Sequence, residues 1–445
     1  MATPPARSMP YRGNLCPFNY ARMYRTVLLK RARTPSAYTC TRNLAMTRGD
    51  VARMPGNIPG KALLNAISQS TSNSPLSMQI AIDAHQIGGR RTGAETYVYN
   101  LVKNLALLEP NGDKYAVYLS SRQGVEGLES NPSFECRSIP TSITSVRYAF
   151  FYPLQSWGKR FDVFHAQFHL PPLLRSRSVL TVYDLMFERF PKLFPRRIYV
   201  PMKLLVPWSC RRAGHIITIS ESSKRDLVEI YRLDPKRITV TYPGPTENCK
   251  PLDAGRAKDR LREAYGIEAP FILYVGNLEP RKNLSRLLEA FAQLKRKELM
   301  VHKLVIVGQK AWLFDGIFET IRNHSLAGEV ILTGYIPAND LPLFYNAASL
   351  MILPSLFEGF GLPVVEAMAC GTPVITSLGS ALEEIAGDAA LLVDPYSVSS
   401  IATAMEKVAN NPGLQRDLSN AALARAARFS FRSMAEQTRS VYHRL

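Results

Sequence analysis

The chain has 445 residues, of which 46% are hydrophobic, and this length predicts at least two domains with large cores. No run approaches the ~18 consecutive apolar residues that a membrane-spanning helix requires. Six cysteines form no CxxC pair and no metal-ligand spacing, so we interpret them as reduced thiols in a cytosolic protein.

The net charge of +19 is unevenly distributed. Residues 1–77 carry 11 basic residues and one acid, residues 78–250 carry a net charge of +9, and residues 251–445 carry none. Such a basic surface could bind nucleic acid, an anionic membrane face or an anionic acceptor. We favour the membrane or the acceptor, because the sequence contains no nucleic-acid-binding motif.

Residues 1–77 are rich in Arg, Ser, Thr and Pro and lack hydrophobic periodicity. Three interpretations remain open: a transit peptide, a disordered basic arm, or translated sequence upstream of the real start. We favour the last one, because Met78 immediately precedes a clear first strand.

The segment after Met78 predicts an α/β domain. The expected strands lie at residues 79–83, 115–119, 162–165, 179–184, 215–220 and 238–242. The loop AHQIGGRRTG at residues 84–93 follows the first strand and leads into a helix. His165, Gln167, His169 and Asp184 lie near strand ends, where open α/β sheets bind ligands. Among them, His165 is either a reacting group or a structural histidine.

A polar linker beginning at Pro243 separates this segment from a second α/β series. Its apolar runs are FILYVG, KLVIVG, EVILTG, LMILPS, PVIT and ALLVD. Helical segments lie between most of them, which indicates a parallel sheet covered on both faces. The expected fold class is therefore α/β, with two Rossmann-like domains at residues 78–243 and 244–428 facing a cleft. Residues 429–445 form a final helix.

The stretch LFEGFGLPVVEAMACGTPVIT, residues 356–376, carries the clearest chemical signal. It predicts a glycine loop after a strand, then a helix beginning at Pro363, a position that suits proline. Free N–H groups at a helix start bind phosphate, and the carboxylates of Glu358 and Glu366 could accept hydrogen bonds from sugar hydroxyls. This combination indicates a sugar nucleotide. The alternative is an ordinary strand-to-helix turn with two solvated glutamates.

Glu358 and Glu366, with seven residues between them, resemble the E-x7-E motif of retaining glycosyltransferases with the GT-B fold. The surrounding EGFGLPVVEAMACGTPVI is similar to family 4, the group 1 glycosyltransferases, which include mannosyltransferases of surface-polysaccharide assembly. The resemblance covers roughly residues 78–445. It implies a GT-B fold whose last helix crosses back to the first domain.

The resemblance also assigns site residues. Arg281 and Lys282 would bind the donor diphosphate without a metal, Glu358 the transferred sugar and Glu366 the ribose. The remaining predicted donor-side positions are Gly89, Gly93, Gly276, Tyr335, Ile336, Gly359, Phe360, Gly361 and Leu362, with Tyr335 and Ile336 at the base. Three positions depart from the family pattern: Glu95 replaces a frequent glycine, Tyr183 a frequent histidine and Asn277 a frequent arginine.

The implied activity is transfer of a hexose, first of all mannose from GDP-mannose, to a hydroxyl of a glycan or lipid-linked acceptor. The anomeric configuration would be retained, and the nucleotide sugar would serve as co-substrate with no further cofactor. The protein would act in the cytoplasm, with a peripheral position at the inner membrane face as one option. Two alternatives remain: a sugar-nucleotide epimerase of the same fold, and a non-catalytic nucleotide-sugar-binding protein.

Overall fold

The computed structural model describes residues 77–445 apart from residues 89–91, 123–124, 126, 129, 159, 269 and 310–314. The expectations for residues 1–77 therefore fall outside the described residues, except at Ser77 itself. Gly89 also lies outside them. The described residues belong to one compact unit that contains two parallel sheets.

The first sheet has seven strands in the order β3-β2-β1-β4-β5-β6-β7, all parallel. Its strands are β1 (Gln79–Ala84), β2 (Lys114–Leu119), β3 (Phe134–Ser138), β4 (Val163–Gln167), β5 (Arg177–Thr181), β6 (His215–Thr218) and β7 (Ile238–Val240). The expected strand at residues 179–184 begins and ends earlier, because Val182 and the residues after it leave the β5 ladder. We call the part of the chain built on this sheet, residues 77–242, the first lobe.

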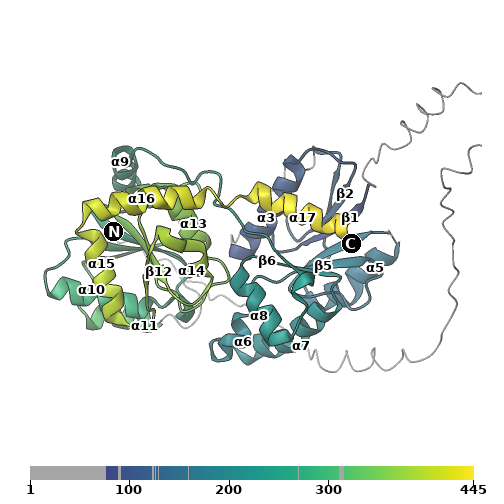
Figure 1. The fold of residues 1–445 in the computed structure, drawn as a ribbon, viewed down its shortest axis with the longest axis horizontal. Coiled ribbons are helices and arrows are strands. Elements are labelled where there is room, and N and C mark those ends of the chain that lie inside the picture. Colours follow the sequence, from purple (N-terminus) through teal and green to yellow (C-terminus); the bar gives the residue numbers. More distant parts are fainter. Residues whose placement is uncertain are drawn as a thin grey trace, which may run out of the picture. The chain divides into compact units, whose positions relative to one another are not determined.

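Successive side chains of β1 point to opposite faces of the first sheet, as in any strand. Ile80 and Ile82 belong to the core under α3 (Gly93–Leu107), whereas Ala81 belongs to the core on the other face. That second face is covered by the π-helix η2 (Arg147–Phe151), α5 (Tyr152–Gly158), α6 (Met186–Arg189), α7 (Arg196–Arg212) and α8 (Glu221–Tyr231). The short helices α4 (Thr144–Val146), η3 (Pro191–Leu193) and η4 (Pro235–Arg237) bury no residue. Figure 1 shows α3 on one side of the strands and α7 on the other.

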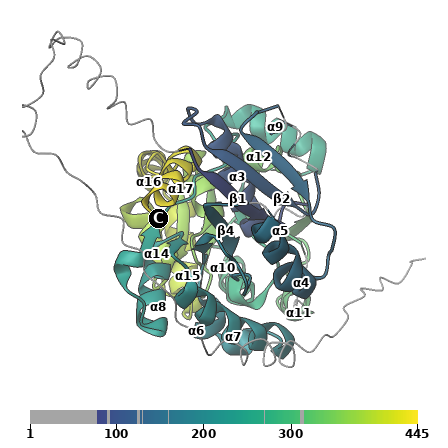
Figure 2. The same cartoon turned by 90° about the vertical axis from the view of Figure 1, so that its right-hand side faces the viewer.

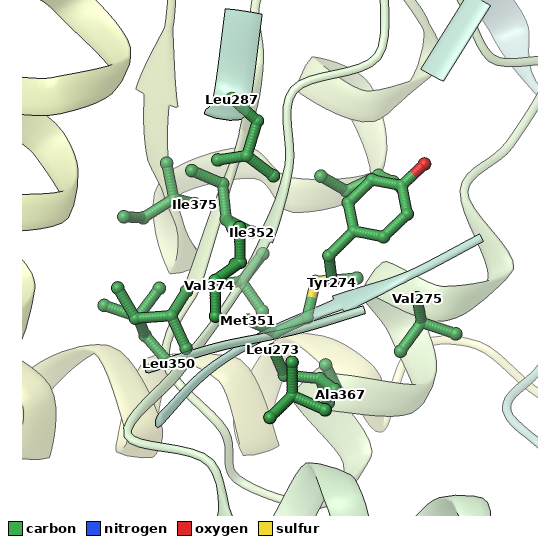
Figure 3. Close-up of a cluster of buried hydrophobic side chains, with 14 of the residues drawn as sticks. Leu273, Tyr274, Val275, Leu287, Leu350, Met351, Ile352, Ala367, Val374 and Ile375 are labelled. Carbon is green, nitrogen blue, oxygen red and sulfur yellow. The ribbon is translucent and has the colours of Figure 1, made fainter. Parts of the chain in front are cut away.

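The second sheet has six parallel strands in the order β10-β9-β8-β11-β12-β13. They are β8 (Phe271–Val275), β9 (Lys303–Val307), β10 (Val330–Gly334), β11 (Leu350–Leu353), β12 (Val374–Ser377) and β13 (Leu391–Val393). The central strands β8 and β11 are apolar on both faces. Figure 3 shows Leu273 of β8, Met351 of β11 and Ile375 of the adjacent β12 among the packed side chains. This is the pattern of a sheet buried between two helical layers.

The helices of the second lobe, residues 244–428, surround that sheet. They are α9 (Ala254–Tyr265), η5 (Pro280–Lys282), α10 (Leu284–Arg296), α11 (Asp315–Asn323), α12 (Leu341–Ala347), α13 (Leu362–Ala369), α14 (Ala381–Ala386), η6 (Gly387–Ala389), α15 (Val398–Ala409) and α16 (Pro412–Ala426). Two connected α/β series were expected from the sequence, and both are present.

The last helix, α17 (Phe431–Arg444), returns to the first lobe and packs against α3. Figures 1 and 2 both show the two helices side by side. The chain passes between the lobes twice, at Gly244 and at Ser430, and the two crossings touch. A Cβ on Gly244 would lie 2.6 Å from the Phe431 nitrogen and 2.8 Å from the Ser430 Cα. Only glycine leaves enough room at this crossing.

Candidate functional site

The loop after β11 brings Glu358 against two cations of the loop after β8. Lys282 Nζ lies 2.6 Å from one Glu358 carboxylate oxygen, and Arg281 pairs with the other. Ser355 Oγ donates a third hydrogen bond to Glu358 at 2.8 Å, and Arg281 also pairs with Glu279. Arg281, Lys282 and Glu358, the residues predicted to bind the diphosphate and the sugar, therefore form one buried ion cluster at the carboxyl ends of β8 and β11.

The electrostatics of this cluster keep Glu358 ionised. Burial alone would raise the pKa of its carboxyl, but Arg281 and Lys282 outweigh burial and lower that pKa to about 2. An ionised carboxylate only accepts hydrogen bonds, so Glu358 suits sugar hydroxyls as donors. The same pairing holds Arg281 and Lys282 in place at the carboxyl ends of β8 and β11.

The two glycines of this loop, Gly359 and Gly361, are required for different structural reasons. Gly361 has φ of +105° at the N-cap of α13, and a Cβ there would lie 2.5 Å from Leu382. At Gly359 a Cβ would lie 2.8 Å from the Asp184 Cβ and 2.9 Å from the Tyr183 carbonyl oxygen. Gly359 is thus needed for close packing of the first lobe against the Glu358 loop, in addition to any ligand approach.

The start of α13 has no side-chain cap, because its N-cap residue is Gly361. Backbone N–H groups at such an end, together with the helix dipole, favour an anion. Helix α13 begins at Leu362, one residue before the predicted start at Pro363, and Pro363 stands in its first turn. Phe360 packs against Tyr242 and Phe429, and Leu362 is also packed in the core, so these two residues can offer only backbone groups.

Glu366 lies further along α13 in a separate buried group. Its carboxylate accepts hydrogen bonds from Tyr345 Oη at 3.1 Å and from Thr246 Oγ1 at 3.2 Å. Burial raises the pKa of this carboxyl to about 7, against the opposing effect of the two hydroxyls. Glu358 is therefore ionised at neutral pH, whereas Glu366 is only partly ionised, even though the two share one motif.

The remaining predicted donor-side positions are spread around this region. Gly276 contacts the side chain of Lys282, since a Cβ on it would lie 3.4 Å from Lys282 Cε. Tyr335 follows β10 and its side chain is exposed, whereas the side chain of Ile336 is buried in the core. Ile336 could therefore contact a nucleotide base only through its backbone. Gly93 is the first residue of α3 and has open space around it.

His165 does not fit the role of a reacting group, and this hypothesis is corrected by its surroundings. The side chain is fully buried in β4, with Nδ1 2.6 Å from Tyr442 Oη of α17 and Nε2 2.7 Å from Thr181 Oγ1. Burial lowers the pKa of the imidazole to about 3. His165 is the structural histidine of the two alternatives, and it ties the last helix to the first sheet.

The three departures from the family pattern have visible consequences. Glu95 is buried, and its carboxylate accepts a hydrogen bond from the Gly88 N–H at 2.8 Å. Tyr183 donates to Gln167 at 2.9 Å and packs edge-on against Tyr97. Asn277 is exposed and uncharged, so Arg281 and Lys282 are the cations at this end of β8.

Two features of the site were missed in the sequence. Gly308 follows β9, and a Cβ there would lie 2.0 Å from the Gly276 carbonyl oxygen, so it shapes the cation loop. Asp83 at the end of β1 is fully buried and accepts hydrogen bonds from Tyr148 Oη, Tyr152 Oη and His85 Nδ1 at 2.8, 2.5 and 2.7 Å. The sequence signal for this second feature was Asp83 at the end of a predicted strand, with His85 two residues later.

The two lobes meet beside the Glu358 loop. Glu384 of α14 accepts hydrogen bonds from the Glu221 and Ser222 N–H groups at the start of α8, both at 2.8 Å. A pocket of about 750 Å³ opens next to this contact, and residues of both lobes line it, among them Arg189, Phe190, Arg225, Phe357, Asp394 and Tyr396. Leu356 and Phe357 line this pocket, whereas Glu358, Arg281, Lys282 and Glu366 do not.

Comparisons with known proteins agree with this geometry. Residues 257–425 match the family model described as glycosyl transferases group 1, and residues 91–245 match glycosyltransferase family 4. O-antigen chain mannosyltransferase B of Escherichia coli is 30% identical over 384 residues, which is 82% of this chain and 99% of that protein.

Solved structures share the fold. Sucrose-phosphate synthase of Thermosynechococcus elongatus aligns with a TM-score of 0.67 at 20% identity, over 82% of this chain and 98% of that chain. HepE of Anabaena, solved in complex with UDP and glucose, aligns with a TM-score of 0.65 at 18% identity, over 83% of this chain and 100% of that chain.

The two parallel-sheet lobes and the matching family models thus define a glycosyltransferase of the GT-B fold. The chain belongs to the group 1 glycosyltransferases of family 4. Among the described residues, no helix is both long and apolar enough to cross a membrane.

Proposed function

We propose that this glycosyltransferase moves mannose from GDP-mannose to a hydroxyl of a glycan or lipid-linked acceptor, with retention of the anomeric configuration. The observation that carries the proposal is the buried cluster of Glu358, Arg281 and Lys282 in front of α13. The choice of mannose is supported by relatives named as mannosyltransferases, including the E. coli protein that matches over most of this chain. The resemblance to retaining enzymes supports the stereochemistry.

Departure of the nucleoside diphosphate is the step that these residues serve. Negative charge grows on the leaving oxygen, and fixed donors aimed at that charge lower the barrier. Arg281, Lys282 and the backbone N–H groups at the start of α13 are the donors in this proposal. Arg281 and Lys282 add fixed side-chain donors for the diphosphate to the backbone N–H groups, so we propose that the reaction proceeds without a metal.

The two glutamates hold different parts of the donor. Glu358 accepts hydrogen bonds from hydroxyls of the transferred sugar, which suits its lowered pKa. Glu366 accepts from the ribose, whose hydroxyls would replace or join Thr246 and Tyr345 as donors. The acceptor hydroxyl attacks from the face that the diphosphate leaves, as the resemblance implies, and we assign no protein nucleophile.

The membrane is the proposed place of work. Residues 78–250 carry a net charge of +9 and residues 251–445 carry none, so an anionic surface would attract the first lobe. A peripheral position at the inner face of the membrane would bring this lobe close to a lipid-linked acceptor.

A thermal-shift panel of nucleotide sugars tests the donor. Ligand at ~100 times its dissociation constant stabilises the folded state by about 2.7 kcal/mol. GDP-mannose should raise the melting temperature more than UDP-glucose, and Glu358→Ala should weaken binding of GDP-mannose much more than binding of GDP. A larger shift with UDP-glucose would overturn the choice of donor.

Incubation with the donor alone separates the proposal from the epimerase alternative. A transferase without acceptor should hydrolyse GDP-mannose slowly to mannose and GDP, whereas an epimerase should convert it into another GDP-hexose. Appearance of the second sugar nucleotide, detected by chromatography, would contradict the proposal.

A further inference from the structure

An apolar stripe lies on the outer side of the first lobe along the segment α4–η2–α5. It comprises Ile143, Val146, Phe150, Leu154 and Trp157, whose side chains are 56%, 39%, 54%, 60% and 46% exposed. Their spacing places them on one side of a helical segment. Figure 2 shows α4 and α5 end to end at the outside of this lobe.

The inner side of the same segment is fixed in place. Tyr148 and Tyr152 point inward and donate hydrogen bonds to the buried carboxylate of Asp83. The Tyr152 N–H bonds the Arg147 carbonyl five residues earlier, which makes this turn a π-helix, a geometry common at functional sites. Because the inner side chains are committed to Asp83, the segment cannot rotate to bury its outer stripe.

The stripe ends in a tryptophan that is held in a defined orientation. Trp157 Nε1 donates to the Leu173 carbonyl at 3.0 Å, and the Arg175 guanidinium stacks over the indole at 4.9 Å from the ring centroid. Tryptophan and arginine side by side suit the boundary between lipid headgroups and acyl chains, where an amphipathic ring and a cation are both favourable.

Positive charge accompanies the stripe on the same face of the sheet. The same layer contains α7, whose 17 residues include five cations and no acid; one of these cations, Lys203, pairs with Glu188 of α6. Ile198, Val200 and Leu204 of that helix are 45%, 49% and 62% exposed. Both α5 and α7 contribute side chains to the core on this face of the sheet, so both belong to the layer that covers it.

We propose that the stripe formed by Ile143, Val146, Phe150, Leu154 and Trp157 inserts into an anionic lipid bilayer, with α7 facing the same surface. A protein partner would explain exposed apolar groups, but the absence of acids on α7 together with the Trp157–Arg175 pair fits anionic lipid better. This inference rests on the proposed membrane position and specifies which surface makes the contact.

Vesicle sedimentation with the full chain tests the proposal. We compare the wild type with Phe150→Glu/Leu154→Glu on vesicles of phosphatidylcholine and phosphatidylglycerol in equal parts. The variant should partition at least about tenfold less, because each substitution replaces an apolar side chain by a charge that the bilayer repels. Phe150→Ala/Leu154→Ala should show a smaller loss of vesicle binding. This variant replaces the charged one in the test if the charged variant fails to fold.

Leu107→Glu is the matched control. Leu107 of α3 is 59% exposed, almost the same as Leu154, but it lies on the helix that covers the opposite face of the first sheet. The control should bind vesicles like the wild type. Equal binding of the wild type and both stripe variants would overturn the proposal, as would equal binding to vesicles of phosphatidylcholine alone.

Two further measurements distinguish this proposal from the proposed donor specificity and from self-association of the chain. The GDP-mannose thermal shift should be the same for wild type and stripe variants, so a failure of the proposed donor is visible independently of vesicle binding. Analytical ultracentrifugation should show the same oligomeric state for all of them. A stripe variant that changes the oligomeric state but not vesicle binding would assign the stripe to a second copy of the chain and refute the proposal.

Discussion

Glu366→Gln should make the protein more stable and at the same time weaken nucleotide binding. The carboxyl is buried between Tyr345 and Thr246, and burial raises its pKa to about 7 from the usual 4.5. Glutamine keeps the shape and an acceptor oxygen but carries no charge. The substitution therefore removes the cost of burying an ionised group. One hydroxyl still donates to the amide oxygen, and the other can accept a hydrogen bond from the amide NH2.

The sign and size of the effect follow from the pKa of Glu366 in the two states. Below pH 4.5 the group is protonated in both the folded and the unfolded chain, and it has no effect. As the pH rises from 4.5 to about 7, the unfolded chain loses this proton first, so the wild type loses stability. A shift of this size corresponds to roughly 3 kcal/mol at ~1.4 kcal/mol for each pH unit.

Thermal unfolding of wild type and Glu366→Gln across this pH range is the measurement. The advantage of the variant should be absent near pH 4.5 and should reach roughly 6–12 °C above pH 7, at ~2–4 °C for each kcal/mol. Parallel melting curves at all pH values would show that the carboxyl is not perturbed as inferred, and the reasoning would fail.

Nucleotide affinity gives an independent check of the ribose assignment. Ribose hydroxyls are donors, so they should prefer the ionised carboxylate of Glu366. With a pKa of about 7, the ionised fraction rises about tenfold between pH 6 and pH 8, and GDP affinity of the wild type should rise with it. Glu366→Gln should lack this component. If the variant binds GDP as tightly as the wild type at pH 8, Glu366 does not contact the ribose.

Three further predictions concern the cation loop, its glycine support and the start of the chain. Lys282→Ala should lower the transfer rate by roughly 10²–10³ without unfolding the protein, since Glu358 keeps its other partners. The control Lys295→Ala, which removes a cation paired with Glu329, should leave the rate unchanged. Wild-type turnover in Lys282→Ala would exclude Lys282 from the charge-stabilising role. Gly308→Ala should lower the melting temperature and GDP-mannose affinity together, because its Cβ would overlap the Gly276 carbonyl oxygen, and an unchanged melting curve would contradict this. A chain that begins at Met78 should fold and retain transfer activity, which circular dichroism and the transfer assay would show.

The sequence by itself determined the repeated strands, the glycine loop with a helix start within one residue of Pro363, and the spacing of Glu358 and Glu366. These features are local, because apolar runs, helix caps and a motif within one loop and helix depend on neighbouring residues. The placement of Arg281 and Lys282 at a strand end was also readable, since parallel strands bring their carboxyl ends to one edge of a sheet. The family resemblance added the expected partner for each group.

Tertiary structure decided which of these groups meet and what charge they carry. Lys282 and Glu358 are 76 residues apart, and His165 finds Tyr442 277 residues later, so neither pairing is visible in a local pattern. The close approach at Gly359 depends on the other lobe in the same way. The physical reason is that burial and long-range partners set these pKa values and contacts: Glu358 and Glu366 belong to one motif, yet cations lower one pKa to about 2 and burial raises the other to about 7.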